Sequence, residues 1–112
     1  MRVTSDEIFS VEPLQINCYV VKRDGRVVDF DYHRIVNAIA KAGTATREFG
    51  RDTACYLASL VVKHLLIGLD GKDRVHVEEI QDIVERVLME SPYKRTAKAY
   101  ILYRDQLSLI HI

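Results

Sequence analysis

Two short runs of β-branched and aromatic residues begin the regularly patterned part of the chain. They cover residues 18–23 and 26–30, and Asp24-Gly25 separates them. Asp-Gly between such runs is a strong hairpin signal, because both central residues of a type I′ turn need positive φ. The pattern therefore predicts a β-hairpin with a two-residue loop.

This loop length sets the register of the hairpin and decides which face is buried. A two-residue loop pairs Val21 with Val28 and Tyr19 with Phe30 on one face of the ribbon. We expect that face to pack on the core, because an isolated hairpin is only marginally stable in water. The opposite face, which could close over a ligand, consists of Cys18, Val20, Lys22, Val27 and Asp29.

Apolar residues at helical spacing dominate the rest of the chain and predict four helices. The first expected helix runs from the N-cap Asp31 to Gly43, and the second runs from Asp52 or Thr53 to a turn at 68–71. The third begins at about Val77, and the fourth begins at the Ser91-Pro92 pair. Residues 74–76 are either a connection or a third short strand. The fold class is thus α+β and mainly helical, with an N-terminal hairpin packed on four helices.

Residues 1–17 show no sustained periodicity, and Pro13 interrupts their one apolar stretch. We interpret them as an extended arm, followed by one domain over residues 18–109 and a C-terminal end at 110–112. The apolar ending at Ile112 fits a chain that is part of a longer protein.

Composition narrows the function classes. The 112 residues carry 16 basic and 16 acidic side chains, and this balance disfavours nucleic acid as a partner. No apolar run approaches the roughly 18–20 residues that span a bilayer, so no membrane partner is expected. Cys18 and Cys55 are isolated, which indicates neither a zinc ribbon nor a disulfide scaffold and favours a reduced, cytoplasmic location.

Candidate chemistry is limited to a few cations. No nucleophile lies in a recognisable catalytic motif and the four histidines lack metal-ligand spacing, so we predict no catalytic and no metal-binding residues. Glycine-rich phosphate loops are missing too. Basic residues do gather at the hairpin tip and in the first and fourth helices, where they could converge on a triphosphate. Taken alone, they are explained at least as well by a solvated turn and solvated helix faces.

Three segments form an ordered set of motifs. They are VVKRDGRVVDFD (20–31) with Arg34-Ile35 and Ala38-Ile39, then VEEIQDIVE (77–85), then AKAYILYR (97–104). Together they resemble the ATP-cone, a regulatory nucleotide-binding domain found chiefly at the N-termini of ribonucleotide reductases. The resemblance spans residues 20–105, and the stretch around Ser91-Pro92-Tyr93-Lys94 is most similar to the anaerobic ribonucleoside-triphosphate reductases.

The resemblance implies an allosteric domain that controls the overall activity of a reductase and holds no catalytic residue or catalytic cofactor. In the family, ATP permits turnover, dATP stops it, and quaternary assembly usually changes. The implied partners are ATP or dATP with Mg²⁺, the catalytic domain of a reductase, and further copies of the chain. The hairpin would form a lid over the nucleotide, and the helices would supply the base pocket. The residues carried over as nucleotide-binding are Val20, Lys22, Arg23, Arg34, Ile35 and Lys98.

Two departures and two alternatives accompany this interpretation. Arg34 stands where the family usually has lysine, and His76 stands where a small capping residue is common. Tyr100 and Tyr103, at helical spacing, are expected in the core rather than stacked on a base. The alternative functions are the cone of a transcriptional regulator of reductase genes, which the lack of a cysteine quartet disfavours, and a degenerate cone that acts only in oligomerisation.

Overall fold

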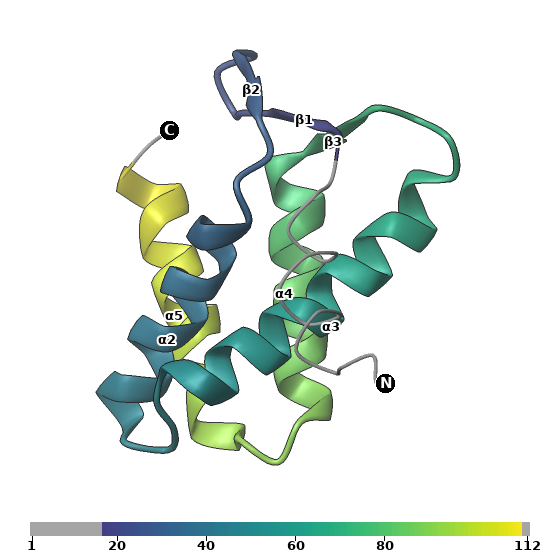
Figure 1. Cartoon of the computed structure of the whole chain (residues 1–112). Helices are drawn as coiled ribbons and strands as arrows, with labels where there is room; N and C mark the ends of the chain where they lie inside the picture. Colours follow the sequence, from purple (N-terminus) through teal and green to yellow (C-terminus); the bar gives the residue numbers. More distant parts are fainter. Residues whose placement is uncertain (1–16, 111–112) are drawn as a thin grey trace, which may run out of the picture.

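The computed structural model describes residues 17–110, with side chains described up to Asp105. Its elements are β1 (Tyr19–Val21), β2 (Val27–Asp29), α2 (Tyr32–Thr46), α3 (Arg51–Leu69), β3 (Arg74–His76), α4 (Val77–Glu90) and α5 (Lys94–Ile110). Within this part of the chain, four helices and a small sheet confirm the α+β class, and residues 74–76 form the third strand (Figure 1). Apart from Asn17 and Ile110, the predicted arm and C-terminal end lie outside the described residues.

The hairpin connection has three residues, so the predicted two-residue loop is wrong. The Lys22 N–H donates to the Arg26 carbonyl oxygen (2.8 Å), and the Gly25 N–H donates to the Lys22 carbonyl oxygen (2.9 Å). Within the loop only Gly25 has positive φ (+90°). A type I′ turn would also need positive φ at Asp24, whereas a three-residue loop that ends in a left-handed glycine does not.

The extra loop residue shifts the strand register by one position. Val20 pairs with Val28, and Tyr19 pairs with Asp29. Paired residues lie on the same face of the ribbon, so the slip places Val28 beside Val20 instead of beside Val21. The predicted core face is also wrong, because Tyr19 is 44% exposed whereas Val20 is buried.

The third strand ties the hairpin to the helices. It adds to the free edge of β1 in parallel, which gives the strand order β2-β1-β3. Val75 pairs with Val20, and both side chains are buried. Since α4 begins at Val77, directly after β3, this pairing places the first turn of α4 beside the hairpin.

Two glycines that were expected to end helices lie inside them. α2 continues past Gly43 to Thr46, and a Cβ at Gly43 would lie 2.2 Å from a ring carbon of Phe49. α3 includes Gly68 and ends at Leu69, with Asp70 as its C-cap residue in the left-handed conformation (φ 48°). Gly43 is thus a close-packing residue rather than a stop signal.

The Ser91-Pro92 pair ends α4, which corrects its predicted role as the start of the fourth helix. The Ser91 hydroxyl donates to the Leu88 carbonyl oxygen (2.6 Å) and accepts the Tyr93 N–H (3.1 Å). α5 begins only at Lys94.

The starts of α2 and α4 agree more closely with the pattern. Asp31 caps α2 by accepting the His33 N–H at 3.0 Å, as predicted. At the start of α4, the Glu79 carboxylate accepts the His76 N–H at 3.0 Å. Glu79 thereby supplies the carboxylate half of a capping box at the start of α4, where His76 stands in place of a small capping residue.

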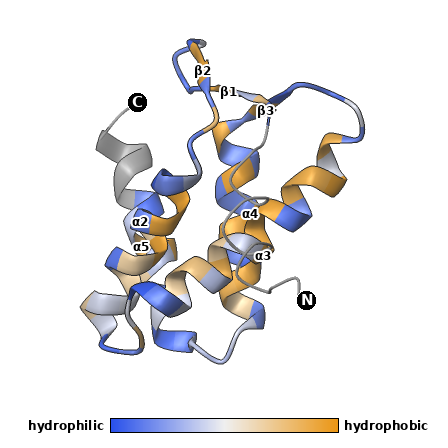
Figure 2. Cartoon of the chain, viewed as in Figure 1, coloured by the Kyte–Doolittle hydropathy of each residue, from blue (hydrophilic) through white to orange (hydrophobic). Residues whose placement is uncertain are grey.

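Each helix packs on two others. α2 and α4 both lie against α3 and α5, and the small sheet covers one end of the assembly (Figure 1). Apolar faces turn inward between the helices (Figure 2), and Ile39, Leu65 and Leu88 are completely buried there. The hairpin stands above the gap between α2 and α4, so its inner face looks onto the tops of these helices.

The length and hydropathy of α3 do not agree with the expectation that no apolar run approaches the length that spans a membrane. It has 19 residues with a mean hydropathy of 1.3 over its most apolar window, which by length and composition alone is enough to cross a membrane. One face of α3 is packed on α2 and α4 through Leu57, Val61 and Leu65. A central helix of a soluble protein meets the same criterion, so this single helix is weak evidence for a membrane span.

Candidate functional site

A cleft of about 570 Å³ lies beneath the hairpin, between the sheet and α2, α4 and α5. Its size is typical of a site for a small molecule. Its apolar wall is built from Val20, Val28, Phe30, Ile35, Ala38, Val77, Ile80, Val84 and Tyr100. Polar side chains join this wall near the loop of the hairpin and at the start of α2.

Tyr100 closes the inner end of the cleft from α5. Its side chain is 5% exposed, and burial raises the pKa of its phenol to about 12. The phenol therefore stays neutral at physiological pH. Tyr103, predicted in the core with it, is 40% exposed, and the Lys41 ammonium lies 5.2 Å from its ring centre. The core prediction is confirmed for Tyr100 and wrong for Tyr103.

A cationic hollow of about 480 Å³ adjoins the apolar wall and shares several of its lining residues. Four basic side chains line it, namely Lys22, Arg23, Arg26 and Arg34. Arg23 lies in the hairpin loop, Lys22 and Arg26 flank that loop, and Arg34 lies in the first turn of α2. Apolar surface and a cluster of basic side chains thus meet in one continuous depression, although the whole chain has a net charge of zero.

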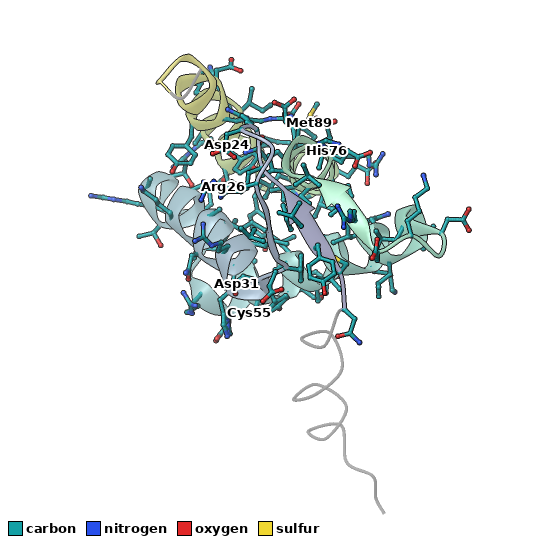
Figure 3. All side chains as sticks on the ribbon, turned by 90° about the horizontal axis from the view of Figure 1, so that it is seen from above. Asp24, Arg26, Asp31, Cys55, His76 and Met89 are labelled. Carbon is teal, nitrogen blue, oxygen red and sulfur yellow. The ribbon has the colours of Figure 1, made fainter. Side chains whose placement is uncertain are left out.

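Each arginine of the hollow has an acidic neighbour. Arg26 Nε lies 2.8 Å from Asp24 Oδ2, and the Arg26 N–H also donates to Asp24 (3.1 Å). Hydrogen bonds from the Arg26 backbone and side chain lower the pKa of the Asp24 carboxyl. Arg34 Nε lies 3.9 Å from Asp31 Oδ2. Figure 3 looks down on the hairpin and shows Asp24 and Arg26 at its loop, with Asp31 where the chain enters α2.

The structure brings together most of the residues expected at the site. Val20, Lys22, Arg34 and Ile35 line the cleft, and Arg23 lines the adjoining hollow. Lys98 does not join them. It lies in a separate shallow groove between α4 and α5, beside Met89 and Leu102.

Arg26, Gln81 and Tyr100 are among the cleft residues that the sequence did not assign to the site. Arg26 lies across the hairpin from Lys22, and the true register would have placed both on the inner face. Gln81 lines both the apolar and the cationic parts, and it was visible only as one member of the 77–85 motif. Tyr100 was assigned to the core, where it does lie, but it also forms a wall of the cleft.

Metal ligands do not converge in the described part of the chain. Among those residues, no group of three or more His, Cys, Asp or Glu side chains could hold a metal ion.

Comparison with known proteins is consistent with this geometry. Residues 18–108 match the family described as the ATP cone domain. The chain belongs to the ATP-cone family. This cone is 45% identical over 92 residues to the vitamin B12-dependent ribonucleoside-diphosphate reductase of Thermoplasma acidophilum, which covers 78% of the chain and 12% of that protein. It is 40% identical over 86 residues to the anaerobic ribonucleoside-triphosphate reductase of Escherichia coli, covering 77% of the chain and 12% of that protein.

A third relative extends the range of reductase types. The cone is 36% identical over 92 residues to the alpha subunit of the ribonucleoside-diphosphate reductase of Chlamydia pneumoniae, covering 77% of the chain and 9% of that protein. The chain thus spans about a tenth of the length of these relatives. Similar cones occur in reductases with different names, so similarity alone does not select one of them.

Proposed function

We propose that this cone binds ATP or dATP in the cleft and controls the overall activity of a ribonucleotide reductase. The observation that supports this most directly is the junction of an apolar cleft with four basic side chains beneath a hairpin, in a chain of the ATP-cone family. A purine base suits the apolar wall, and a triphosphate suits the cationic hollow.

Individual roles follow from position. Val20 and Ile35 would contact the nucleoside, since both belong to the apolar wall. Lys22, Arg23 and Arg34 would hold the phosphates, with Arg26 as a fourth cation. Lys98 is left out of this set because it lies in another groove.

Mg²⁺ would accompany the triphosphate. Mg²⁺ is commonly bound through phosphate oxygens and one or two carboxylates. Asp29 and Asp31 both line the cleft, so the side chains present fit a magnesium-bound nucleotide. When bound, the ion would neutralise part of the phosphate charge.

Regulation requires that the two nucleotides favour different arrangements of the protein. A ligand with equal affinity for two states shifts neither, so ATP and dATP must differ in how they bind one of them. The partners in that change would be the catalytic domain of the reductase and further copies of the chain, in the cytoplasm. Overall identity does not select the type of reductase, and we propose an anaerobic triphosphate reductase as the parent enzyme because the segment around Ser91-Pro92-Tyr93-Lys94 resembles those enzymes.

Calorimetric titration of the chain with ATP, dATP and adenosine tests nucleotide binding. We expect both triphosphates to bind more tightly than adenosine, because adenosine has no phosphate to accept hydrogen bonds from the four basic side chains of the hollow. Lack of binding at millimolar ATP and dATP would refute nucleotide sensing and leave oligomerisation as the alternative. Joining the cone to a candidate catalytic domain, with dATP as inhibitor, would then test control of activity.

A further inference from the structure

The tip of the hairpin is fastened to the first turn of α4 through Arg23. Arg23 Nε lies 3.1 Å from Glu78 Oε2, and Arg23 Nη2 donates to Gln81 Oε1 at 3.0 Å. These contacts connect residues more than 50 positions apart in the sequence. They leave the Arg23 side chain only 26% exposed, although it belongs to an exposed loop.

Of the two elements joined by this contact, α4 is the better anchored. Arg104 of α5 lies across α4, with Nη2 at 2.8 Å from Asp82 Oδ1 and Nη1 at 3.0 Å from Glu85 Oε1. Arg104 Nη2 also donates to the Glu78 carbonyl oxygen (3.3 Å), and its side chain is 17% exposed. The hairpin strands have three residues each, so we expect the loop rather than α4 to move when the contact opens.

Arg23 cannot keep this contact and also give its full set of donors to a phosphate. Its Nε and one Nη already point to Glu78 and Gln81, which leaves only part of the guanidinium for a ligand in the hollow. A phosphate that approached the same edge would face the Glu78 carboxylate, and like charges at short range repel.

We propose that Glu78 sets the affinity of the cone for the charged part of its effector, by holding Arg23 in the empty domain and competing with phosphate for it. The proposal rests on nucleotide binding in the cleft, and adds that binding exchanges the partner of Arg23. The exchange frees the hairpin loop from α4, so occupancy of the phosphate hollow and the position of the loop change together. An uncharged nucleoside leaves the Arg23–Glu78 contact in place.

Replacement of Glu78 by glutamine tests this exchange, since it removes the competing charge at a side chain that is 58% exposed. Because an exposed ion pair contributes little free energy, we expect only a modest gain, with ATP and dATP binding about two- to fivefold more tightly to Glu78→Gln. The affinity for adenosine should be unchanged. Glu90→Gln is the matched control, because it removes the same charge from the far end of α4, and its affinities should equal those of the unmodified chain. Thermal melts of both variants would check that the fold is retained.

The outcomes separate this inference from the proposed function. Binding of ATP with unchanged or weaker affinity in Glu78→Gln overturns the competition and leaves nucleotide binding intact. Equal tightening for adenosine, or in Glu90→Gln, also overturns it, because the effect would then not act through phosphate at Arg23. If neither the unmodified chain nor Glu78→Gln binds any nucleotide, both the function and the inference fail.

Discussion

Replacing Gly43 by alanine tests whether this glycine serves close packing rather than helix termination. It lies within α2, and a Cβ there would be 2.2 Å from one carbon of the Phe49 ring and 2.5 and 2.6 Å from two others. Phe49 cannot simply turn away, because its ring packs edge-on against Tyr93 with 4.7 Å between ring centres. The ring must therefore shift and weaken that contact.

Two opposite effects determine the size of the change. Alanine is favoured over glycine inside a helix by about 0.5–1 kcal/mol. Forcing an extra methyl group into a packed site costs about 1–3 kcal/mol, and an aromatic pair is worth about 0.5–1.5 kcal/mol beyond its buried area. The clash outweighs the helix preference, so we expect Gly43→Ala to lower the free energy of unfolding by about 1–3 kcal/mol.

The chain supplies a matched control in Gly68, which is also helical but has no atom within 4 Å of its ideal Cβ position. Gly68→Ala should therefore leave stability unchanged or raise it by up to about 0.5–1 kcal/mol. Urea and thermal unfolding followed by circular dichroism would measure both variants, and a loss of 1 kcal/mol corresponds to roughly 4–8 °C in Tm for a domain near this size. A Gly43→Ala variant as stable as Gly68→Ala would refute the reasoning, since it would show that Phe49 gives way at no cost.

Two further predictions concern ligand binding and acid stability. Lys22→Ala should weaken ATP binding about tenfold in calorimetry, which is the usual scale for a charge-assisted hydrogen bond, and should leave adenosine binding unchanged. Lys98→Ala should change neither affinity, because Lys98 lies in a separate groove. Equal losses of ATP affinity in the two variants would contradict the placement of the phosphates. The Thr96 hydroxyl and N–H both donate to Glu48 Oε1 at 2.7 Å, and these hydrogen bonds lower the pKa of the Glu48 carboxyl. The ionised carboxylate therefore stabilises the fold fully above the ordinary glutamate pKa, and this stabilisation is lost as the pH falls through the lowered pKa of the folded protein. Glu48→Gln should consequently reduce the fall of Tm between about pH 6 and pH 3, and an unchanged pH profile would show that Glu48 is not linked to folding.

Local signals predicted the elements of this fold well and their ends less well. The structure confirms the N-cap at Asp31 and the predicted helix start near Val77, because both depend on residues close together in the chain. The glycines were misleading, because a glycine in a helical pattern can mark an end or a close contact. Only the approach of Phe49 to Gly43 distinguishes the two.

The hairpin shows how one local choice affects the site. Asp24-Gly25 fits either a two-residue or a three-residue loop, and the alternation of apolar residues in each strand did not separate them. Pairing of β1 with β3 places Val20 against Val75 in the core. The register of the three-residue loop then puts Lys22 and Arg26, which lie on the same face as Val20, together over the cleft. The burial of Val20 depends on a strand 55 residues away, which no local pattern contains.

By itself, the sequence determined the element types, the hairpin with its basic loop, and the motifs that place the chain in the ATP-cone family, because these depend on side-chain periodicity and residue order. The tertiary structure alone decided which basic residues converge. It joined Arg26 to Lys22, separated Lys98 from both, and paired Arg23 with Glu78. Convergence depends on strand register and helix packing, which are set by contacts between residues distant in the chain, and such contacts leave no mark in the local pattern.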